Sequence, residues 1–191
     1  ANARTTHLIV SSGRTAKQYA TAFGIPEDKI YVLGLPRTDR MLDSRWLAEK
    51  KARFLDEYPE LKGKRRILYA PTFRDQEVKH PKIALDLQKF VQGLDEDTVF
   101  MLRFHPHVAE NLREQDLPED NRIINVSGYP GVTTLLAAAD LLVTDYSSII
   151  YEYCLLERPI CFFAYDLDEF ARDGRDFYED YRSFVPGPVV E

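Results

Sequence analysis

The sequence predicts an α/β protein built on a parallel sheet with helices on both faces. Short apolar runs alternate with amphipathic stretches along the chain, and the runs are continuous rather than alternating apolar with polar residues. Continuous apolar strands are typical of parallel sheets that are covered on both faces. A length of 191 residues, 45% of them hydrophobic, is enough for one domain with a buried core. We therefore expect a single domain over 1–191.

The expected strands are apolar runs that end at polar or turn-forming residues. In chain order they are His7–Ser12, Ile30–Gly34, Arg66–Pro71, Thr98–Phe104, Asn121–Val126, Leu141–Thr144 and Pro159–Ala164.

The expected helices lie between these strands and have apolar residues at helical spacing. The second of them begins at Thr38 or Asp39, either of which can cap a helix. In chain order the helices are Arg14–Phe23, 39–58, Ile83–Gly93, a short one after Ala109, Gly131–Ala138 and Ser148–Leu156.

Charge and composition exclude several classes of protein. The net charge is −6, and residues 166–191 alone account for −5, so a basic footprint for nucleic acid is absent. No uncharged apolar run is long enough to span a bilayer, and the start lacks the apolar core of a signal peptide. Cys154 and Cys161 lie in apolar segments, which is typical of buried free thiols in a reducing compartment. The aromatic and acidic tail 165–191 is expected to pack against other parts of the protein.

Polar residues follow the expected strands and should meet at one edge of the sheet. The segments are Ser11–Ser12, Gly34–Arg37, Thr72–Asp75, His105–His107 and Asp145–Ser148. Ligands of open parallel sheets bind outside the carboxyl ends of the strands, so this edge is the predicted site.

The strongest local signal is the strand-to-helix turn at Asp145–Ser148. The hydroxyls of Ser147 and Ser148, with the first N–H groups of the helix, can bind a phosphate or diphosphate; alternatively, a serine only caps the helix. Asp145 would repel a phosphate, so it is expected to cap or orient the turn. Glu152 lies one helical turn after Ser148. It can accept hydrogen bonds from ribose hydroxyls, or it is a solvated or salt-bridged helix residue.

Two further turns offer donors for phosphate. His105 can donate to a diphosphate oxygen or protonate a leaving group, although a His-Pro turn with satisfied rings also explains it. Thr72 and Arg74 end another strand, and a guanidinium can donate two hydrogen bonds to phosphate. A metal site at His105 and His107 would need a third ligand, and none has suitable spacing. We therefore predict no metal site.

Taken in order, four motifs resemble the CDP-glycerol glycerophosphotransferases of teichoic acid synthesis. They are GLPRTD at Gly34–Asp39, ILYAPTFRD at Ile67–Asp75, RFHPH at Arg103–His107 and TDYSSIIYEY at Thr144–Tyr153, and RPICFF at Arg158–Phe163 fits as well. The family is similar to GT-B glycosyltransferases, in which two Rossmann-like halves face each other. The resemblance implies that this chain is the C-terminal, donor-binding half, with His7–Phe23 as its first strand and helix.

The resemblance also implies an activity and roles for residues. The activity is transfer of glycerol phosphate from CDP-glycerol to a hydroxyl of a lipid-linked acceptor, with release of CMP and without a cofactor. His105 would contact the diphosphate and assist the departure of CMP, and Glu152 would hold the ribose. The loop Val126–Gly131 would face the cytosine. The remaining diphosphate ligands would be Thr72, Arg74, Ser147 and Ser148.

The resemblance leaves one catalytic part outside this sequence. The base for the acceptor hydroxyl belongs to the N-terminal half, and His7 and His80 lie in the wrong segments to replace it. We therefore expect the chain alone to bind donor weakly without turnover.

The resemblance also implies that the intact enzyme lies in the cytoplasm, on the inner face of the cell membrane. The basic segment Arg45–Arg66 is a solvated helix face or a patch for anionic lipid.

Other functions fit the same residues. They are transfer of ribitol phosphate from CDP-ribitol, another GT-B nucleotide-sugar transferase or 2-epimerase, and a nucleotide-binding module without chemistry.

Overall fold

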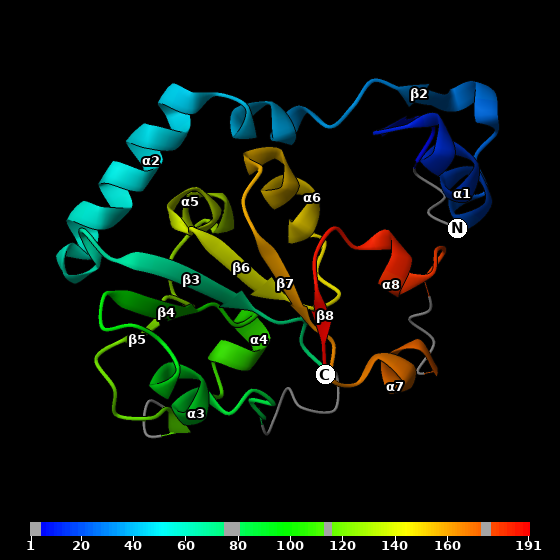
Figure 1. Cartoon of the computed structure of the whole chain (residues 1–191). Coiled ribbons are helices and arrows are strands. Elements are labelled where there is room, and N and C mark those ends of the chain that lie inside the picture. Colours follow the sequence, from blue (N-terminus) through cyan, green and yellow to red (C-terminus); the bar gives the residue numbers. More distant parts are fainter. Residues whose placement is uncertain (1–4, 75–80, 113–115, 173–176) are drawn as a thin grey trace. The chain divides into compact units, whose positions relative to one another are not determined.

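The computed structural model describes residues 5–74, 81–112, 116–172 and 177–191. The chain divides into two compact units, Ala1–Asp43 and Ser44–Glu191, where the sequence analysis expected one domain. We describe each unit by itself (Figure 1).

The first unit is a small β-α-β element. Strands β1 (Leu8–Val10) and β2 (Ile30–Val32) pair in parallel as a separate two-stranded sheet, and helix α1 (Gly13–Phe23) connects them. Ser12 caps α1 by accepting a hydrogen bond from the Thr15 N–H. This unit corrects the expectation that His7–Phe23 opens the donor-binding sheet, because β1 pairs with β2 and not with a strand of the larger sheet.

The end of the first unit and the start of α2 differ from the sequence prediction. Pro36–Met41 forms a 3-10 helix, and helix α2 begins only at Ser44. Neither Thr38 nor Asp39 therefore caps α2. Thr38 instead donates its hydroxyl to the carbonyl of Leu35 within the 3-10 turn.

The second unit contains a parallel sheet of six strands in the order β5-β4-β3-β6-β7-β8. This is the strand order of the doubly wound dinucleotide-binding fold, in which the direction of winding reverses between the first and fourth strands. Here that reversal lies between β3 and β6, so a ligand is expected at their carboxyl ends. The strands are β3 (Arg65–Ala70), β4 (Thr98–Leu102), β5 (Ile123–Asn125), β6 (Leu141–Thr144), β7 (Ile160–Phe163) and β8 (Val189–Val190).

Helices cover both faces of this sheet (Figure 1). Helices α2 (Ser44–Glu57), α5 (Val132–Ala138) and α6 (Ile149–Tyr153) lie on one face, and α2 packs against α5. Helices α3 (Leu87–Gln92) and α4 (Pro106–Ala109) lie on the other. The arrangement confirms the predicted α/β class with a covered parallel sheet.

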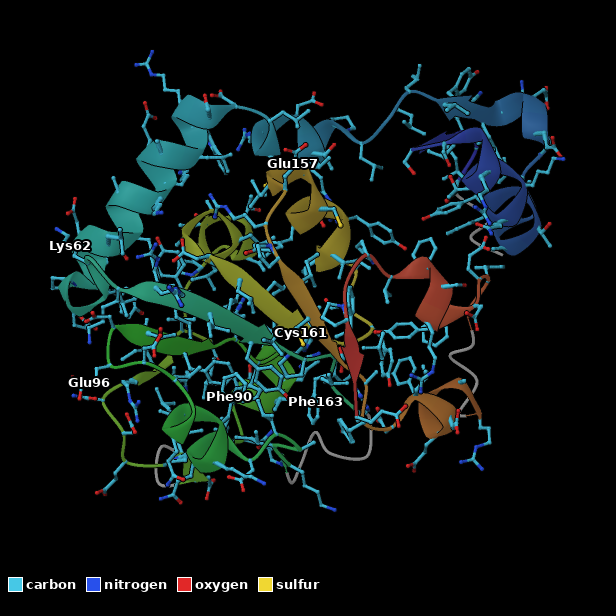
Figure 2. The ribbon with its side chains drawn as sticks, viewed as in Figure 1. Lys62, Phe90, Glu96, Glu157, Cys161 and Phe163 are labelled. Carbon is cyan, nitrogen blue, oxygen red and sulfur yellow. The ribbon has the colours of Figure 1, made fainter. Side chains whose placement is uncertain are left out.

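The core follows the alternation of side chains along the strands. On the α3 side, Tyr69 and Phe100 pack with Leu87 and Val91 of the helix. Phe90, Cys161 and Phe163 pack against the same cluster (Figure 2). The opposite faces of the same strands carry Leu68 and Met101, which are fully buried.

The tail forms more structure than its sequence pattern indicates. It contains helices α7 (Leu167–Arg172) and α8 (Tyr181–Phe184), and β8 pairs in parallel with β7. Tyr181 is buried, and its ring meets Phe162 of β7 edge to face. The tail thus supplies β8, an edge strand of the six-stranded sheet.

Candidate functional site

The carboxyl ends of β3 and β6 are joined by two hydrogen bonds at the reversal of strand order. The Thr144 hydroxyl donates to the Ala70 carbonyl at 2.7 Å, and the Thr72 N–H donates to Asp145 Oδ1 at 2.8 Å. Asp145 is 2% exposed and also accepts the N–H of Tyr146. Asp145 therefore accepts backbone N–H groups from the turns after both strands.

Four predicted site residues line one small cavity at this edge: Thr72, Arg74, His105 and Asp145. Phe73, Phe104 and Tyr165 line it as well, with residues 81–84. Its volume of about 30 Å³ has room for little more than a water molecule. A nucleotide would therefore lie on the open edge beside this cavity and not inside it.

His105 follows β4 at the same edge and occupies the cap position of α4. Its Nδ1 accepts the N–H of His107 at 3.4 Å, so the neutral ring carries its hydrogen on Nε2. The ring centroid lies 4.5 Å from that of Phe73. Burial lowers the pKa of His105, and the nearby charges of His107 and Arg103 lower it further. The ring is therefore held as a neutral donor near pH 7.

Ser147 and Ser148 lie in the turn after β6 and Glu152 lies in α6, and none of the three lines the small cavity. Ser148 stands at the cap position of α6 and makes no capping hydrogen bond there, so the capping explanation does not apply to it. Among the described residues, the Ser147 hydroxyl accepts a long contact of 3.5 Å from the Ile149 N–H. Glu152 is 9% exposed, so it is not a solvated helix residue.

Arg74 is bound to protein groups rather than facing the open edge. Its Nε and Nη2 donate to the two oxygens of Asp166 at 2.7 and 2.8 Å, and Nη2 also donates to Asp145 at 3.1 Å. Its Nη1 donates to the Thr72 carbonyl, so four of its five N–H groups are used. The side chain is 14% exposed. The role of Arg74 as a diphosphate ligand stays a prediction.

Several residues of this edge are missing from the sequence prediction. Asp166 binds Arg74 and accepts the Tyr146 hydroxyl, while the Tyr181 hydroxyl donates to the Asp145 carbonyl at 2.8 Å. Arg103 donates to the Ser127 carbonyl and so ties the loops after β4 and β5 together. The aromatic and acidic composition of the tail was the one signal for this packing.

The loop Val126–Gly131 is anchored by its side chains. Val126 is fully buried, and the Tyr129 ring packs edge to face on Phe54 of α2 at 5.2 Å. Its orientation toward a cytosine stays a prediction.

The described residues contain neither a metal-binding cluster nor a membrane-spanning helix. The His, Cys, Asp and Glu side chains there form no cluster of three that would hold a metal ion. Among the helices described, none combines the length and apolar character needed to cross a membrane.

Fold and site together define a class: a Rossmann-like α/β unit whose ligand edge lies at the switch point between β3 and β6. A UDP-GlcNAc 2-epimerase from Methanocaldococcus jannaschii shares this fold, with a TM-score of 0.58 at 20% identity over 98% of this chain and 50% of that chain. The chain belongs to the CDP-glycerol:poly(glycerophosphate) glycerophosphotransferase family, whose pattern it matches over residues 1–191.

Relatives in this family are enzymes of teichoic acid synthesis. The chain is 38% identical to the teichoic acid poly(ribitol-phosphate) polymerase of Bacillus spizizenii, over 97% of this chain and 30% of the relative. It is 32% identical to the teichoic acid glycerol-phosphate primase of Bacillus subtilis, over 95% of this chain and 45% of the relative. A structure of the wall teichoic acid polymerase TagF, 33% identical, superimposes with a TM-score of 0.82 over 97% of this chain and 46% of that one. The chain thus spans less than half of each of these relatives.

Proposed function

We propose that this chain supplies the donor-binding half of a glycerophosphotransferase. The whole enzyme would transfer glycerol phosphate from CDP-glycerol to a hydroxyl of a lipid-linked teichoic acid acceptor. The observation that supports this most directly is the meeting of three loops, after β3, β4 and β6, at the switch point of the sheet. This edge presents donors for an anionic diphosphate, and the chain's family is named for this transfer.

The proposed reaction is an in-line displacement at phosphorus. The acceptor oxygen forms a bond to the phosphorus that carries glycerol, and the bond from that phosphorus to the bridging oxygen breaks. The bridging oxygen takes the electron pair and leaves as part of CMP. The proton of the acceptor hydroxyl goes to a base that this chain does not provide, so the chain alone would bind donor without turnover.

The protein's part in this reaction is positioning and neutralisation of charge. His105 would donate its Nε2 hydrogen to a diphosphate oxygen, and the Ser147 and Ser148 hydroxyls would donate to others. Thr72 lines the same small cavity as His105, and its hydroxyl would donate to a further diphosphate oxygen. Glu152 would accept the ribose hydroxyls from its place in α6.

Ribitol phosphate is the second candidate for the transferred group. Relatives named for ribitol phosphate are 37–38% identical to this chain, and those named for glycerol phosphate are 32–34% identical. Both donors share the CDP group that the described edge would hold. This part of the site therefore does not distinguish glycerol from ribitol, and binding experiments are needed to identify the donor.

The donor class is tested by calorimetry with CDP, CDP-glycerol, CDP-ribitol and UDP-GlcNAc on residues 1–191. We expect binding of all three cytidine ligands and none of UDP-GlcNAc. Binding of the UDP-sugar alone would instead favour a nucleotide-sugar enzyme. Binding of none would contradict a donor site in this chain.

The same titration identifies the residues that bind. We expect His105→Ala to weaken CDP binding about tenfold, the typical loss for a hydrogen bond to a charged group. His7→Ala changes the same residue type in the first unit and is the matched control. Equal binding by both variants would remove His105 from the donor site.

Because the acceptor is lipid-linked, we also place the intact enzyme on the inner face of the cell membrane. Binding of the intact enzyme to anionic vesicles tests this placement, and Arg45→Glu and Arg53→Glu report on helix α2. In the structure these two arginines pair with Glu49 and Glu57 one turn on, which leaves little unbalanced charge there. Unchanged vesicle binding by both variants would exclude α2 as the contact.

A further inference from the structure

An ionic cluster joins the tail to the two loops that flank the switch point. Arg74 lies between Asp145, which follows β6, and Asp166, which precedes α7. All three side chains are largely buried, at 14%, 3% and 11% exposure. A buried cation with two carboxylates is held in one geometry because any displacement leaves a charge unpaired.

Aromatic rings close this cluster. The guanidinium carbon of Arg74 lies 5.1, 5.6 and 5.0 Å from the ring centroids of Tyr146, Tyr165 and Phe170. The Tyr146 ring stacks on Phe170 at 3.9 Å, and its hydroxyl donates to Asp166 at 2.9 Å. Residues from the β6 turn and from the tail thus surround the same cation.

The cluster acts on the backbone of both loops. Asp145 Oδ1 accepts the N–H groups of Thr72 and Tyr146, and its Oδ2 accepts from Arg74. On the other side, the Tyr181 hydroxyl donates to the Asp145 carbonyl. The path of the chain into Ser147 and Ser148 is therefore fixed by groups from β3, β6 and the tail together.

We propose that Arg74, Asp145 and Asp166 form a latch by which the tail positions the donor-binding loops. In this proposal Asp166 and Tyr181 are positioning residues that touch no substrate. The proposal rests on the proposed function for the identity of the donor. It replaces the expected role of Arg74 as a ligand of the diphosphate with a role behind the binding surface.

The pKa shifts favour the charged forms of Arg74 and Asp166, whereas burial raises the pKa of Asp145 against the opposing effect of Arg74. Burial opposes the charge of Asp166, but hydrogen bonds from Arg74 and Tyr146 outweigh it and lower the pKa of Asp166. The pKa of Arg74 is raised in spite of burial, by its hydrogen bond to Asp166 and by both carboxylates.

The decisive variant is Asp166→Asn, which keeps the size of the side chain and removes its charge. Asp168→Asn, two residues along and exposed in α7, is the matched control. The first readout is amide hydrogen exchange of the free protein 1–191. We expect faster exchange at the Thr72 and Tyr146 amides in Asp166→Asn, and no change there in Asp168→Asn. Unchanged exchange at both amides would overturn the latch.

The second readout is the affinity for CDP, measured at a temperature where each variant is folded by circular dichroism. We expect about tenfold weaker binding by Asp166→Asn and by Tyr181→Phe, and wild-type binding by Asp168→Asn. Faster exchange with unchanged affinity would overturn the positioning role, because the cluster would then only stabilise the fold. If the wild type bound no cytidine ligand, the proposed function would fail, and hydrogen exchange would still decide whether the latch exists.

Discussion

The N–H of Thr72 donates a 2.8 Å hydrogen bond to Asp145 Oδ1, across 73 positions of sequence and at the point where the strand order reverses. The bond belongs to a buried group of charges in which Asp145 also faces Arg74. Asp145 therefore has two structural duties, as an acceptor for backbone N–H groups and as the counter-ion of a cation.

Removing this carboxylate should be costly for stability. In Asp145→Ala, Arg74 keeps only Asp166 as an ionic partner, and the N–H groups of Thr72 and Tyr146 lose their acceptor. We expect the free energy of unfolding to fall by about 3 kcal/mol, as for other broken buried pairs. Urea titration measures it. The exposed Asp168→Ala should stay within about 0.5 kcal/mol of wild type; equal losses in both variants would contradict a buried role for Asp145.

The titration of His105 gives a prediction with a definite sign. Because its pKa is lowered from 6.5 by burial and by His107 and Arg103, the unfolded chain binds more protons than the folded one between that lower value and 6.5. Above pH 6.5 the titration of His105 therefore leaves the free energy of unfolding unchanged. As the pH falls from 6.5 to the lowered pKa, this residue increasingly destabilises the folded state. NMR of the ring protons should give a midpoint below 6.5, and His107→Gln should move it upward.

A bound donor should reverse this shift. A diphosphate next to the ring favours the imidazolium, so saturating CDP should raise the His105 midpoint relative to the free protein. A midpoint that ignores CDP, in a protein that binds it, would place the diphosphate away from this ring.

Substitutions of Ser148 and Asp86 distinguish CDP binding from helix capping. Ser148 makes no capping bond to α6, whereas the Asp86 carboxylate accepts the Lys89 N–H at 3.0 Å and caps α3. Ser148→Ala should therefore leave the free energy of unfolding within about 0.5 kcal/mol and weaken CDP binding. Asp86→Ala should cost about 1 kcal/mol and leave CDP binding unchanged. Thermal unfolding with and without CDP measures both; a stability loss of cap size in Ser148→Ala would restore the capping explanation.

The first unit should be locally unstable in this chain. Two parallel strands alone bury little apolar surface, and Ile9, Tyr31 and Val32 are 51%, 44% and 52% exposed. We expect amide hydrogen exchange at β1 and β2 to be faster than at the central strands β3 and β4 by at least a hundredfold. Equal protection of both sheets would contradict this separation.

The strands β3 to β7 of the central sheet were predictable because each is a continuous apolar run with a clear end. Leu141–Thr144 was predicted with its observed bounds, and Arg66–Pro71 is shifted by one residue from β3. The convergence of the following turns was predictable for the same reason, since parallel strands share an edge. What the pattern could not supply is which sheet a strand joins. The run at His7–Ser12 reads like the others, yet β1 pairs only with β2.

The hydrogen-bond partners of Arg74 were not predictable from its neighbours in sequence. A guanidinium that follows a strand can bind a phosphate as well as a carboxylate. The partner of Arg74, Asp166, lies 92 positions further along the chain. The two-residue strand β8 was missed because so short a segment has no periodicity to detect. Its place is fixed by backbone contacts with β7.

Gly187 controls the approach of β8 to the sheet, which gives a last test of the tail's contribution. A Cβ at this position would lie 2.2 Å from the Ile160 carbonyl oxygen, a backbone atom that cannot move aside. Gly187→Ala should therefore separate β8 from β7, lower the free energy of unfolding by about 2 kcal/mol and weaken CDP binding through the tail. Gly13→Ala in the first unit is the matched control, because no atom lies within 4 Å of the added Cβ. Urea titration and calorimetry give the two readouts. Full CDP affinity in a destabilised Gly187→Ala protein would mean that the donor edge is independent of the β7–β8 pairing.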